Sequence, residues 1–298
     1  MRRGILLLAS LLALVSCANS RYATGPDTDD IEALPGYRGT IQAVSYKCSE
    51  KNLDERRFTV YLPPGYFKDT QKRYPVMYVF HGARGNEVTW IERGDCLITL
   101  DSLYARGAVE EFILVLPNAN HYYGRRDYKN GRAVNSVRAF WTVNGEVEAN
   151  FMGDVVAEVE RRYRTIPEKR ARAIAGMSTG ALQAMYISAN NPDSFDYVGL
   201  FSAYAYDELA EMRNPQFYEA LTCKMRTQFS VPPSFYGLYI GKKDIFYPHM
   251  MLFDRSMTRR GYKHELVVTP GGHEWYNWRK YLIMFYQEAF RQSLSTAL

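Results

Sequence analysis

The chain of 298 residues has few of the side chains that build metal or disulfide sites, with only four cysteines and five histidines. It contains no CxxC pair, and no cysteines have the spacing of metal ligands, which argues against a zinc or dithiol redox protein. It also lacks any Lys/Arg-rich run. The formal net charge of +5 falls to +3 without Arg2 and Arg3, so the sequence carries no signature of nucleic-acid binding.

Internal repeats and low-complexity blocks are also missing. Hydrophobic residues make up 47% of the sequence, and 24 residues are tyrosines, so a single folded domain over residues 37–298 can bury a large core. Residues 20–36 combine Gly, Pro, Asp and Thr with little periodicity. This composition is typical of a flexible tether rather than of a packed element.

The N-terminus has no apolar run long enough to cross a bilayer. Two arginines precede an apolar stretch from Ile5 to Val15, which has the length of a signal-peptide core. The stretch ends in "LVSC", residues 14–17, which resembles a bacterial lipobox. We therefore predict a lipoprotein signal peptide over 1–16 and a lipid anchor on Cys17. An ordinary secretory signal that contains a cysteine is the alternative.

The residue after the predicted anchor is Ala18, whereas an aspartate there often retains lipoproteins at the inner membrane. We therefore expect an exported protein at the outer membrane, facing the periplasm or the exterior, with a tether over 17–36. An odd number of remaining cysteines leaves at least one thiol free in an exported chain. We expect these cysteines to be small buried residues, with one bridge possible among Cys48, Cys96 and Cys223.

Apolar strands alternate with amphipathic helices from about Tyr37 onward. The expected strands lie within residues 40–46, 56–66, 74–82, 110–120, 171–176, 197–204, 235–241 and 264–272. The expected helices lie at 147–164, at 179–191, between Phe246 and Gly261, and from about 275 to 292. This alternation predicts an α/β fold with a mostly parallel central sheet covered by helices on both faces. Sites in such sheets form at the carboxyl ends of the strands.

A serine stands between two glycines in "AIAGMSTGAL", which gives the G-x-S-x-G motif over 176–180. A predicted strand precedes the motif and a predicted helix follows it, which is the context of a nucleophile elbow. The Ser178 hydroxyl would then lie at a helix N-terminus, where backbone N–H groups stabilise negative charge. We predict that Ser178 is a catalytic nucleophile rather than only a helix cap.

A serine nucleophile needs a base to take its proton, and His273 follows the last predicted strand in the glycine-rich segment "TPGGHEWYNW". This places His273 at the same sheet edge as Ser178. By contrast, His264 begins that strand at the opposite edge, and His249 lies within a predicted helix. We therefore expect His273 to be the base.

The base needs an acid that fixes its tautomer and stabilises its protonated form. Asp244, in "LYIGKKDIFY", follows the preceding strand and completes the chain order Ser, Asp, His. Its alternative use is to cap a helix. If Asp244 has that role, Asp207 is the next candidate for the acid.

Two backbone N–H groups are expected to hold the oxyanion. One belongs to Thr179, directly after the nucleophile. The other comes from the loop in "VFHGARGNE", where we choose Ala83, with Gly82 close by. His81 directly follows a buried strand, which suggests that it braces this loop and is not the base.

Four segments occur in order: "FHGARGNEVTW", "AGMSTGA", "GKKD" and "PGGHEWYNWR". With them, the chain resembles the esterase D-like branch of the α/β hydrolases over about residues 40–292. Within that branch it looks most like the carbohydrate esterases of family 1, the feruloyl and acetyl-xylan esterases. Mycolyltransferases share the branch. The resemblance implies an α/β-hydrolase fold, a triad of Ser178, Asp244 and His273, and oxyanion amides at Ala83 and Thr179.

Two departures from the family pattern stand near the predicted site. Arg84 replaces a small residue, and Thr179-Gly180-Ala181 replaces the frequent Met-Gly-Gly. Both oxyanion donors are backbone groups, so the chemistry is expected to survive, while Arg84 is a candidate for substrate contact.

Aromatic residues suggest how a substrate binds. The segment 118–145 is long for a connection and rich in aromatic and basic residues. Three aromatic residues are candidates to stack on a phenolic acid or sugar ring. They are Tyr122 in this segment and Trp90 and Trp275 beside the catalytic loops. The alternative is that these rings only pack the segment and loops onto the body.

These patterns predict a serine esterase that needs no metal or organic cofactor and acts on feruloyl or acetyl esters of plant polysaccharide or oligosaccharide. Three alternatives stay open. An acyltransferase would use the same triad, a siderophore esterase would use arginines to grip an anionic complex, and an inert surface lipoprotein would only bind carbohydrate.

Overall fold

The structure is a computed structural model that describes residues 39–50, 53, 55–120, 146–204 and 215–290. Within them no helix combines the length and apolarity needed to cross a bilayer. Several predicted features lie outside the described residues. These are the signal peptide over 1–16, Cys17, the tether over 17–36, Tyr122 and Asp207.

Eight strands form one sheet in the order β1-β2-β4-β3-β5-β6-β7-β8. Their bounds are β1 Thr40–Lys47, β2 Glu55–Leu62, β3 Val76–Phe80, β4 Ile113–Pro117, β5 Arg172–Met177, β6 Tyr197–Phe201, β7 Phe235–Gly241 and β8 Glu265–Thr269. The first two strands pair antiparallel, and β2 is antiparallel to β4. The other six strands are parallel. All eight expected strands are present, and the predicted mostly parallel α/β fold is confirmed.

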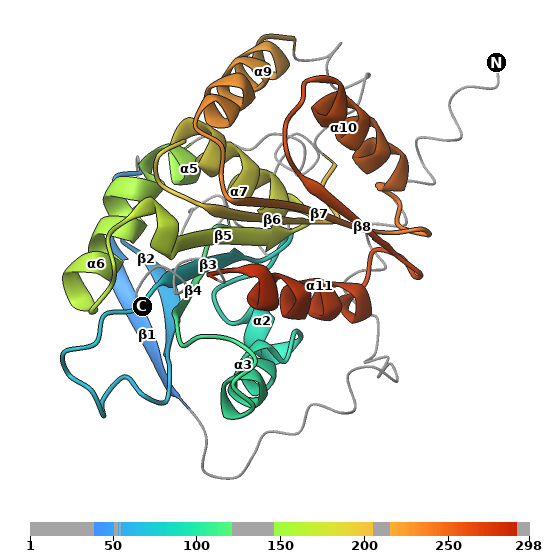
Figure 1. Cartoon of the computed structure of the whole chain (residues 1–298). Coiled ribbons are helices and arrows are strands. Elements are labelled where there is room, and N and C mark those ends of the chain that lie inside the picture. Colours follow the sequence, from blue (N-terminus) through green and yellow to red (C-terminus); the bar gives the residue numbers. More distant parts are fainter. Residues whose placement is uncertain (1–38, 51–52, 54, 121–145, 205–214, 291–298) are drawn as a thin grey trace, which may run out of the picture.

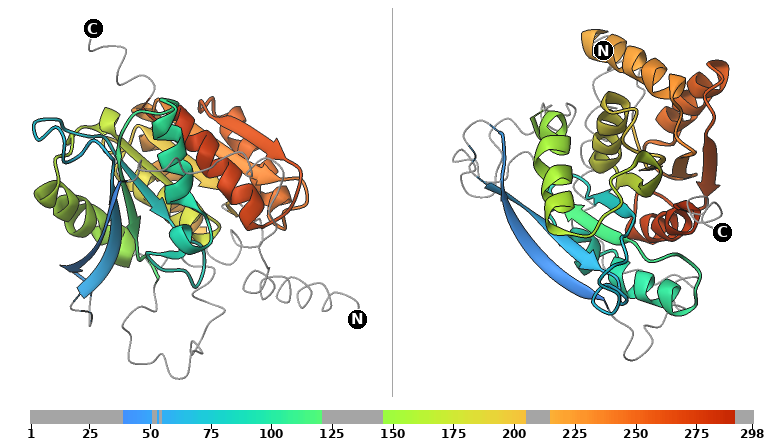
Figure 2. Two further views of the ribbon diagram at one scale, coloured as in Figure 1. Left: turned by 90° about the horizontal axis from the view of Figure 1, so that it is seen from below. Right: turned by 60° about the vertical axis from the view of Figure 1, so that its left-hand side comes forward.

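Helices cover both faces of this sheet, as predicted (Figure 1). One face carries α5 (Glu146–Phe151), η2 (Met152–Val156), α6 (Ala157–Arg162), α7 (Thr179–Asn190), α9 (Pro215–Ser230) and α10 (Tyr247–Arg259). The other carries α2 (Thr89–Glu92), α3 (Cys96–Ala105) and α11 (Trp275–Glu288). The sheet is twisted, so its edge strands β1 and β8 run in clearly different directions (Figure 2).

Each face of the sheet has its own hydrophobic cluster, because successive side chains of a strand point to opposite sides. In β3, Val76, Tyr78 and Phe80 join the cluster under α5 and α7, whereas Met77 and Val79 join the cluster under α3 and α11. Burial of each such side chain contributes about 1.5–3 kcal/mol.

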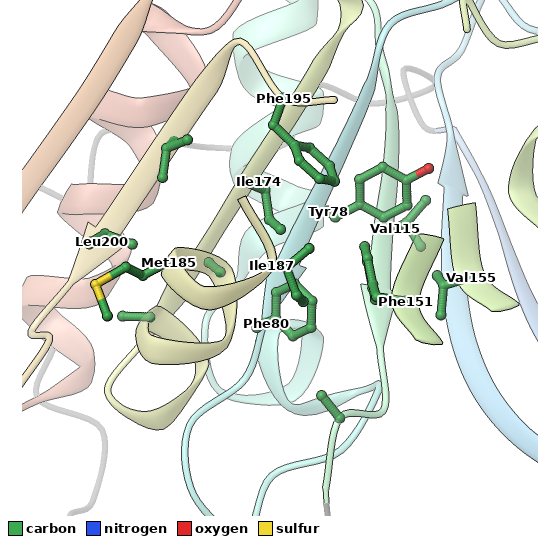
Figure 3. Packing of buried hydrophobic residues seen from close by; sticks show 14 of the residues in the cluster. Tyr78, Phe80, Val115, Phe151, Val155, Ile174, Met185, Ile187, Phe195 and Leu200 are labelled. Carbon is green, nitrogen blue, oxygen red and sulfur yellow. The ribbon is translucent and has the colours of Figure 1, made fainter. Parts of the chain in front are cut away.

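The first cluster is rich in aromatic contacts (Figure 3). The Tyr78 ring meets Phe151 and Phe195 edge to face, with ring centroids 5.4 and 6.2 Å apart. These contacts fix α5 and the segment before β6 on β3, the strand that pairs with β5 ahead of the nucleophile turn.

Two helix predictions need correction. The helix expected over 147–164 contains a single wider turn, the π-helical η2, between α5 and α6. The last helix ends at Glu288 rather than at about 292. The sequence did not locate α2, α3 and α9, and in α3 eight of ten residues are buried, which removes the polar face that a periodicity argument needs.

Candidate active site

The carboxyl ends of β3, β5, β6, β7 and β8 are neighbours along one edge of the sheet. Ser178 follows β5, Asp244 lies three residues after β7, and His273 lies four residues after β8. Because these strands are parallel and adjacent in pairs, residues far apart in the sequence meet at this edge. The three predicted catalytic residues therefore all follow strands that end at this edge.

Ser178, His273 and Asp244 form a continuous hydrogen-bonded chain. The Nε2 atom of His273 lies 3.0 Å from Ser178 Oγ, and its Nδ1 atom lies 3.1 Å from each carboxylate oxygen of Asp244. The side chains of Asp244 and His273 are 0% and 7% exposed, and Ser178 is 8% exposed. The structure thus brings together all three residues of the predicted triad.

The contacts define the tautomer of the neutral imidazole. A carboxylate only accepts hydrogen bonds, so Nδ1 of His273 carries the proton that it donates to Asp244. The Nε2 atom is then unprotonated and accepts the hydroxyl proton of Ser178. This is the arrangement in which a histidine can deprotonate a serine.

Aromatic rings hold the His273 imidazole from two sides. The Phe246 and Trp278 rings meet it nearly perpendicularly, with centroids 5.1 and 4.9 Å away. The loop that carries the histidine is fixed by Asn277, whose side-chain amide donates to the Gly272 carbonyl at 2.9 Å. The histidine therefore has little rotational freedom.

Opposing effects act on the Asp244 carboxyl. Burial raises its pKa, but the hydrogen bond and positive charge of His273 lower it, as do hydrogen bonds from the Phe246 amide and the Ser202 hydroxyl. The lowering effects win, so the pKa of Asp244 lies below its ordinary value. The group is ionised at neutral pH and can stabilise a protonated imidazole.

The turn that carries Ser178 is strained in the way a nucleophile elbow requires. Ser178 has φ 54° and ψ −120°, a region that non-glycine residues rarely adopt. A Cβ atom on Gly176 would lie 2.4 Å from the Gly180 carbonyl oxygen, and one on Gly180 would lie 2.3 Å from the His81 carbonyl oxygen. Both glycines of the motif are therefore needed for close backbone approach.

We expect Gly180→Ala to lower the free energy of unfolding by about 3 kcal/mol, because the new methyl group collides with backbone that cannot move aside. Gly153 is the matched control, since a Cβ there meets nothing within 4 Å. Gly153→Ala should be neutral or stabilising by about 0.5–1 kcal/mol. Urea unfolding of both variants checks this, and a wild-type midpoint for Gly180→Ala would contradict it.

The predicted oxyanion loop passes directly beside the nucleophile. A Cβ on Gly82 would lie 3.6 Å from Ser178 Cβ, in ordinary contact. Within the described parts of the chain, the amide N–H groups of Ala83 and Thr179 have no protein acceptor, and both residues border the cleft at Ser178. Two backbone donors are therefore unused among residues that line the same cleft as Ser178.

His81 braces this loop, as the sequence predicts. The Ala119 amide donates to its Nε2 atom at 3.1 Å, so the Nδ1–H group donates to the Gly82 carbonyl at 2.7 Å. A second brace joins Asn118 to Glu87, with 2.6 Å between the amide nitrogen and carboxylate oxygen. Residues after β4 thus hold the loop after β3 in place.

A cleft of about 340 Å³ opens onto the triad. Its lining includes the aromatic residues Tyr204, Phe246, Trp275 and Trp278 and the arginines Arg84 and Arg93. The Arg93 guanidinium lies over the Trp275 ring, 5.3 Å from its centroid. Two predicted substrate-binding residues, Trp275 and Arg84, therefore lie on the cleft wall.

The prediction that Trp90 contacts substrate is corrected by the structure. Trp90 is 1% exposed, its indole N–H donates to the Phe80 carbonyl at 2.9 Å, and its ring packs edge-on against Trp275. It supports the cleft wall from behind. Its sequence position beside the catalytic loops predicted that Trp90 lies near the site. Whether its side chain is exposed to the cleft depends on how the chain folds.

The other histidines considered for the base are elsewhere. His264 pairs with Asp254, with 3.0 Å between Nε2 and Oδ1, and His249 lies within α10.

Among the described residues no group of three His, Cys, Asp or Glu side chains could hold a metal ion. The three cysteines Cys48, Cys96 and Cys223 are free. Cys96 is buried as expected, and burial raises the pKa of its thiol, but Cys48 is half-buried and Cys223 is exposed, so the expectation of buried cysteines is wrong for Cys223.

Sequence reasoning missed four residues of the site: Phe246, Trp278, Tyr204 and Ser202. The first two lie in segments already quoted for Asp244 and His273, so their closeness to the triad in sequence was a usable signal. Tyr204 and Ser202 follow β6, whose end lies between those of β5 and β7. That position follows from strand order, which the sequence alone does not give.

Comparison with known proteins identifies an esterase family and a feruloyl esterase relative. The model of a family described as "Putative esterase" matches residues 49–237. A curated relative, described as an endo-1,4-beta-xylanase/feruloyl esterase of Xylanibacter ruminicola, is 29% identical over 259 residues. The match covers 85% of this chain and 32% of that protein, so the chain spans about a third of the relative's length.

Solved structures share the fold. A ferulic acid esterase superposes with a TM-score of 0.70 at 23% identity, covering 86% of this chain and 99% of that one. A feruloyl esterase module from Clostridium thermocellum, solved in complex with sinapinate, has a TM-score of 0.67 at 23% identity. That comparison covers 91% of this chain and 94% of the module.

Proposed function

The chain belongs to the family described as "Putative esterase", and on this premise we propose that it is a carboxylic ester hydrolase acting through a Ser178-His273-Asp244 triad. Its proposed substrates are acyl esters of plant polysaccharide or oligosaccharide, with feruloyl as the preferred acyl group. The observation that carries the proposal is the aromatic cleft beside the Ser178 hydroxyl. Flat apolar walls with a few polar groups suit a phenolic ring. The description of the Xylanibacter ruminicola relative supports the same class.

In the first half of the proposed reaction, Ser178 Oγ attacks the ester carbonyl carbon while His273 Nε2 takes the hydroxyl proton. The carbonyl oxygen becomes an oxyanion, held by the amides of Ala83 and Thr179. The C–O bond to the sugar then breaks, and the protonated His273 gives its proton to the leaving alcohol. An acyl-enzyme on Ser178 remains.

In the second half, water replaces the alcohol. His273 takes a proton from the water, and the resulting hydroxide attacks the acyl carbon. The second oxyanion collapses, Ser178 leaves and recovers its proton from His273, and the free acid departs. Asp244 remains ionised throughout and stabilises each protonated state of the histidine.

The test uses arabinoxylan that carries both feruloyl and acetyl esters, with free ferulate and acetate measured together and the Ser178→Ala variant as the blank. Release of ferulate that depends on Ser178 supports the proposal. Acetate alone would mean a small acyl pocket and would overturn the feruloyl preference. Neither acid, from an enzyme that still cleaves a simple aryl ester, would favour acyl transfer or a siderophore ester.

The cleft wall makes a more specific prediction. Trp275→Ala should lower kcat/KM for methyl ferulate about 10-fold more than for methyl acetate, since an aromatic pair is worth about 0.5–1.5 kcal/mol beyond its area. Comparing the two esters in one variant cancels any general damage to the triad. An unchanged ratio would rule out Trp275 as part of a feruloyl-binding wall.

The proposed setting is outside the cytoplasm. We propose export through the signal peptide over 1–16 and attachment to the outer membrane through lipid on Cys17. This placement would give the enzyme access to polysaccharide fragments that do not enter the cytoplasm. The membrane and an acylated carbohydrate are then its two partners.

A further inference from the structure

Ser202 joins the end of β6 to the triad. It is fully buried and has φ 53°, one of five non-glycine residues with positive φ among the described residues. Its amide donates to the Tyr239 carbonyl of β7 at 2.8 Å. Ser178 repeats the device one strand earlier, with φ 54° and an amide that donates to the Phe201 carbonyl at 2.8 Å. Strain of this kind persists where the surroundings enforce it, often at functional sites.

The direction of the Ser202 hydroxyl follows from its neighbours. The Trp278 indole N–H lies 3.1 Å from Ser202 Oγ, and an indole nitrogen is a donor only. The serine oxygen therefore accepts from Trp278 and still has a proton to donate. Trp278 also packs against His273, whose Nδ1–H group donates to Asp244, so Ser202 belongs to the same cluster as the Asp244 carboxyl, whose pKa it lowers.

We propose that Ser202 is a positioning residue of the triad, whose hydroxyl, oriented by the Trp278 indole, holds the Asp244 carboxylate in place against His273. The proposal rests on the proposed catalytic triad. With the Phe246 amide and the His273 Nδ1–H group, the Ser202 hydroxyl gives Asp244 three kinds of donor. A carboxylate held from three directions keeps the imidazole in its productive tautomer and orientation.

The test compares Ser202→Ala with Ser202→Gly, using 4-nitrophenyl acetate as substrate. Both variants lose the hydroxyl, but glycine relieves the backbone strain and alanine keeps it. Both should lower kcat about 10- to 100-fold, the range expected when a carboxylate loses one hydrogen bond. KM should change less than about twofold, because Ser202 does not line the cleft and contributes little to substrate binding.

A double-mutant cycle tests the link to Trp278. Phenylalanine keeps a ring against His273 but has no N–H, so Trp278→Phe should lower kcat several-fold in the wild type. In the Ser202→Gly background the same change should have an effect below about twofold, because residues that act through one another are not additive. Ser188→Ala is the matched control, since it removes a buried hydroxyl that donates to the Met185 carbonyl within α7.

Three outcomes decide the proposal, with thermal unfolding confirming that each variant is folded. Equal losses of kcat for alanine and glycine support it. Wild-type kcat in both, or full activity restored by glycine alone, would overturn it and assign Ser202 to the backbone turn. Ser178→Ala, assayed in parallel, separates the two levels: if that variant stays active the triad itself is wrong, and if it is inactive while the Ser202 variants are normal only this inference fails.

Discussion

Replacing Ser178 with alanine is expected to lower kcat for a simple aryl ester by about 10⁴- to 10⁶-fold, the loss seen when a triad nucleophile is removed. The hydroxyl lies 3.0 Å from His273 Nε2, so its removal takes away the group that the proposed base would deprotonate. Binding should persist, because the cleft walls stay intact. Initial rates with 4-nitrophenyl acetate give the measurement.

Ser188→Ala again provides the control, because it removes a buried hydroxyl outside the cleft. It should keep wild-type kcat. A fluorophosphonate probe should label the wild-type protein on Ser178 and leave Ser178→Ala unlabelled. Hydrolysis by the Ser178→Ala protein at more than a few per cent of the wild-type rate would mean that another group is the nucleophile.

Asp244→Asn is expected to lower kcat by about 10⁴-fold, as loss of the acid does in other triads. The asparagine amide can donate to Nδ1 of His273, which favours the tautomer with its proton on Nε2. That proton blocks the position that must accept from Ser178. The variant should therefore lose catalysis while its overall geometry and its binding of substrate remain.

The chain offers a matched control in a second Asp–His pair, Asp254 and His264, at 3.0 Å. Asp254→Asn breaks the same kind of contact away from the cleft and should keep kcat within about twofold, because it removes no group that stabilises the transition state. Comparable losses in the two variants would show that the effect comes from folding and not from the triad.

The low pKa of Asp244 also sets a pH dependence of stability. A carboxyl whose pKa is lowered by folding stabilises the native state above its unfolded pKa, about 3.9 for aspartate. The contribution is lost as the pH falls through the folded value. The difference in unfolding free energy between wild type and Asp244→Asn should therefore be constant near neutral pH and shrink below about pH 4. A difference that stays constant down to pH 2 would contradict this assignment.

Much of the site could be predicted because catalytic chemistry and chain order constrain each other. The elbow at Ser178 needs two glycines and a strand–turn–helix context, and both are local in sequence. Once the nucleophile was placed, a parallel sheet required the acid and base to follow later strands at the same edge. That requirement selects Asp244 and His273 over His264, which lies at the opposite end of β8.

What could not be predicted depends on the folded state. Trp90 is close to the catalytic loops in sequence, yet it is buried behind Trp275, and no sequence pattern separates a ring that lines a cleft from one that supports it. Ser202 carries no motif, and its role arises from the order of β5, β6 and β7 and from a rare backbone conformation. Nor does composition reveal that a π-helical turn interrupts the helix before α6.

The first turns of α11 carry Trp275, Asn277 and Trp278, which form the cleft wall, hold the His273 loop and pack against the imidazole. Under the proposed function, one helix therefore serves both acyl recognition and proton transfer. A lineage that shifted α11 to admit a different acyl group would displace its own base at the same time. Substitutions that change the acyl group are therefore expected at cleft residues outside this helix, such as Tyr204, Arg84 and Arg93. A new side chain at these positions can reshape the cleft without moving His273.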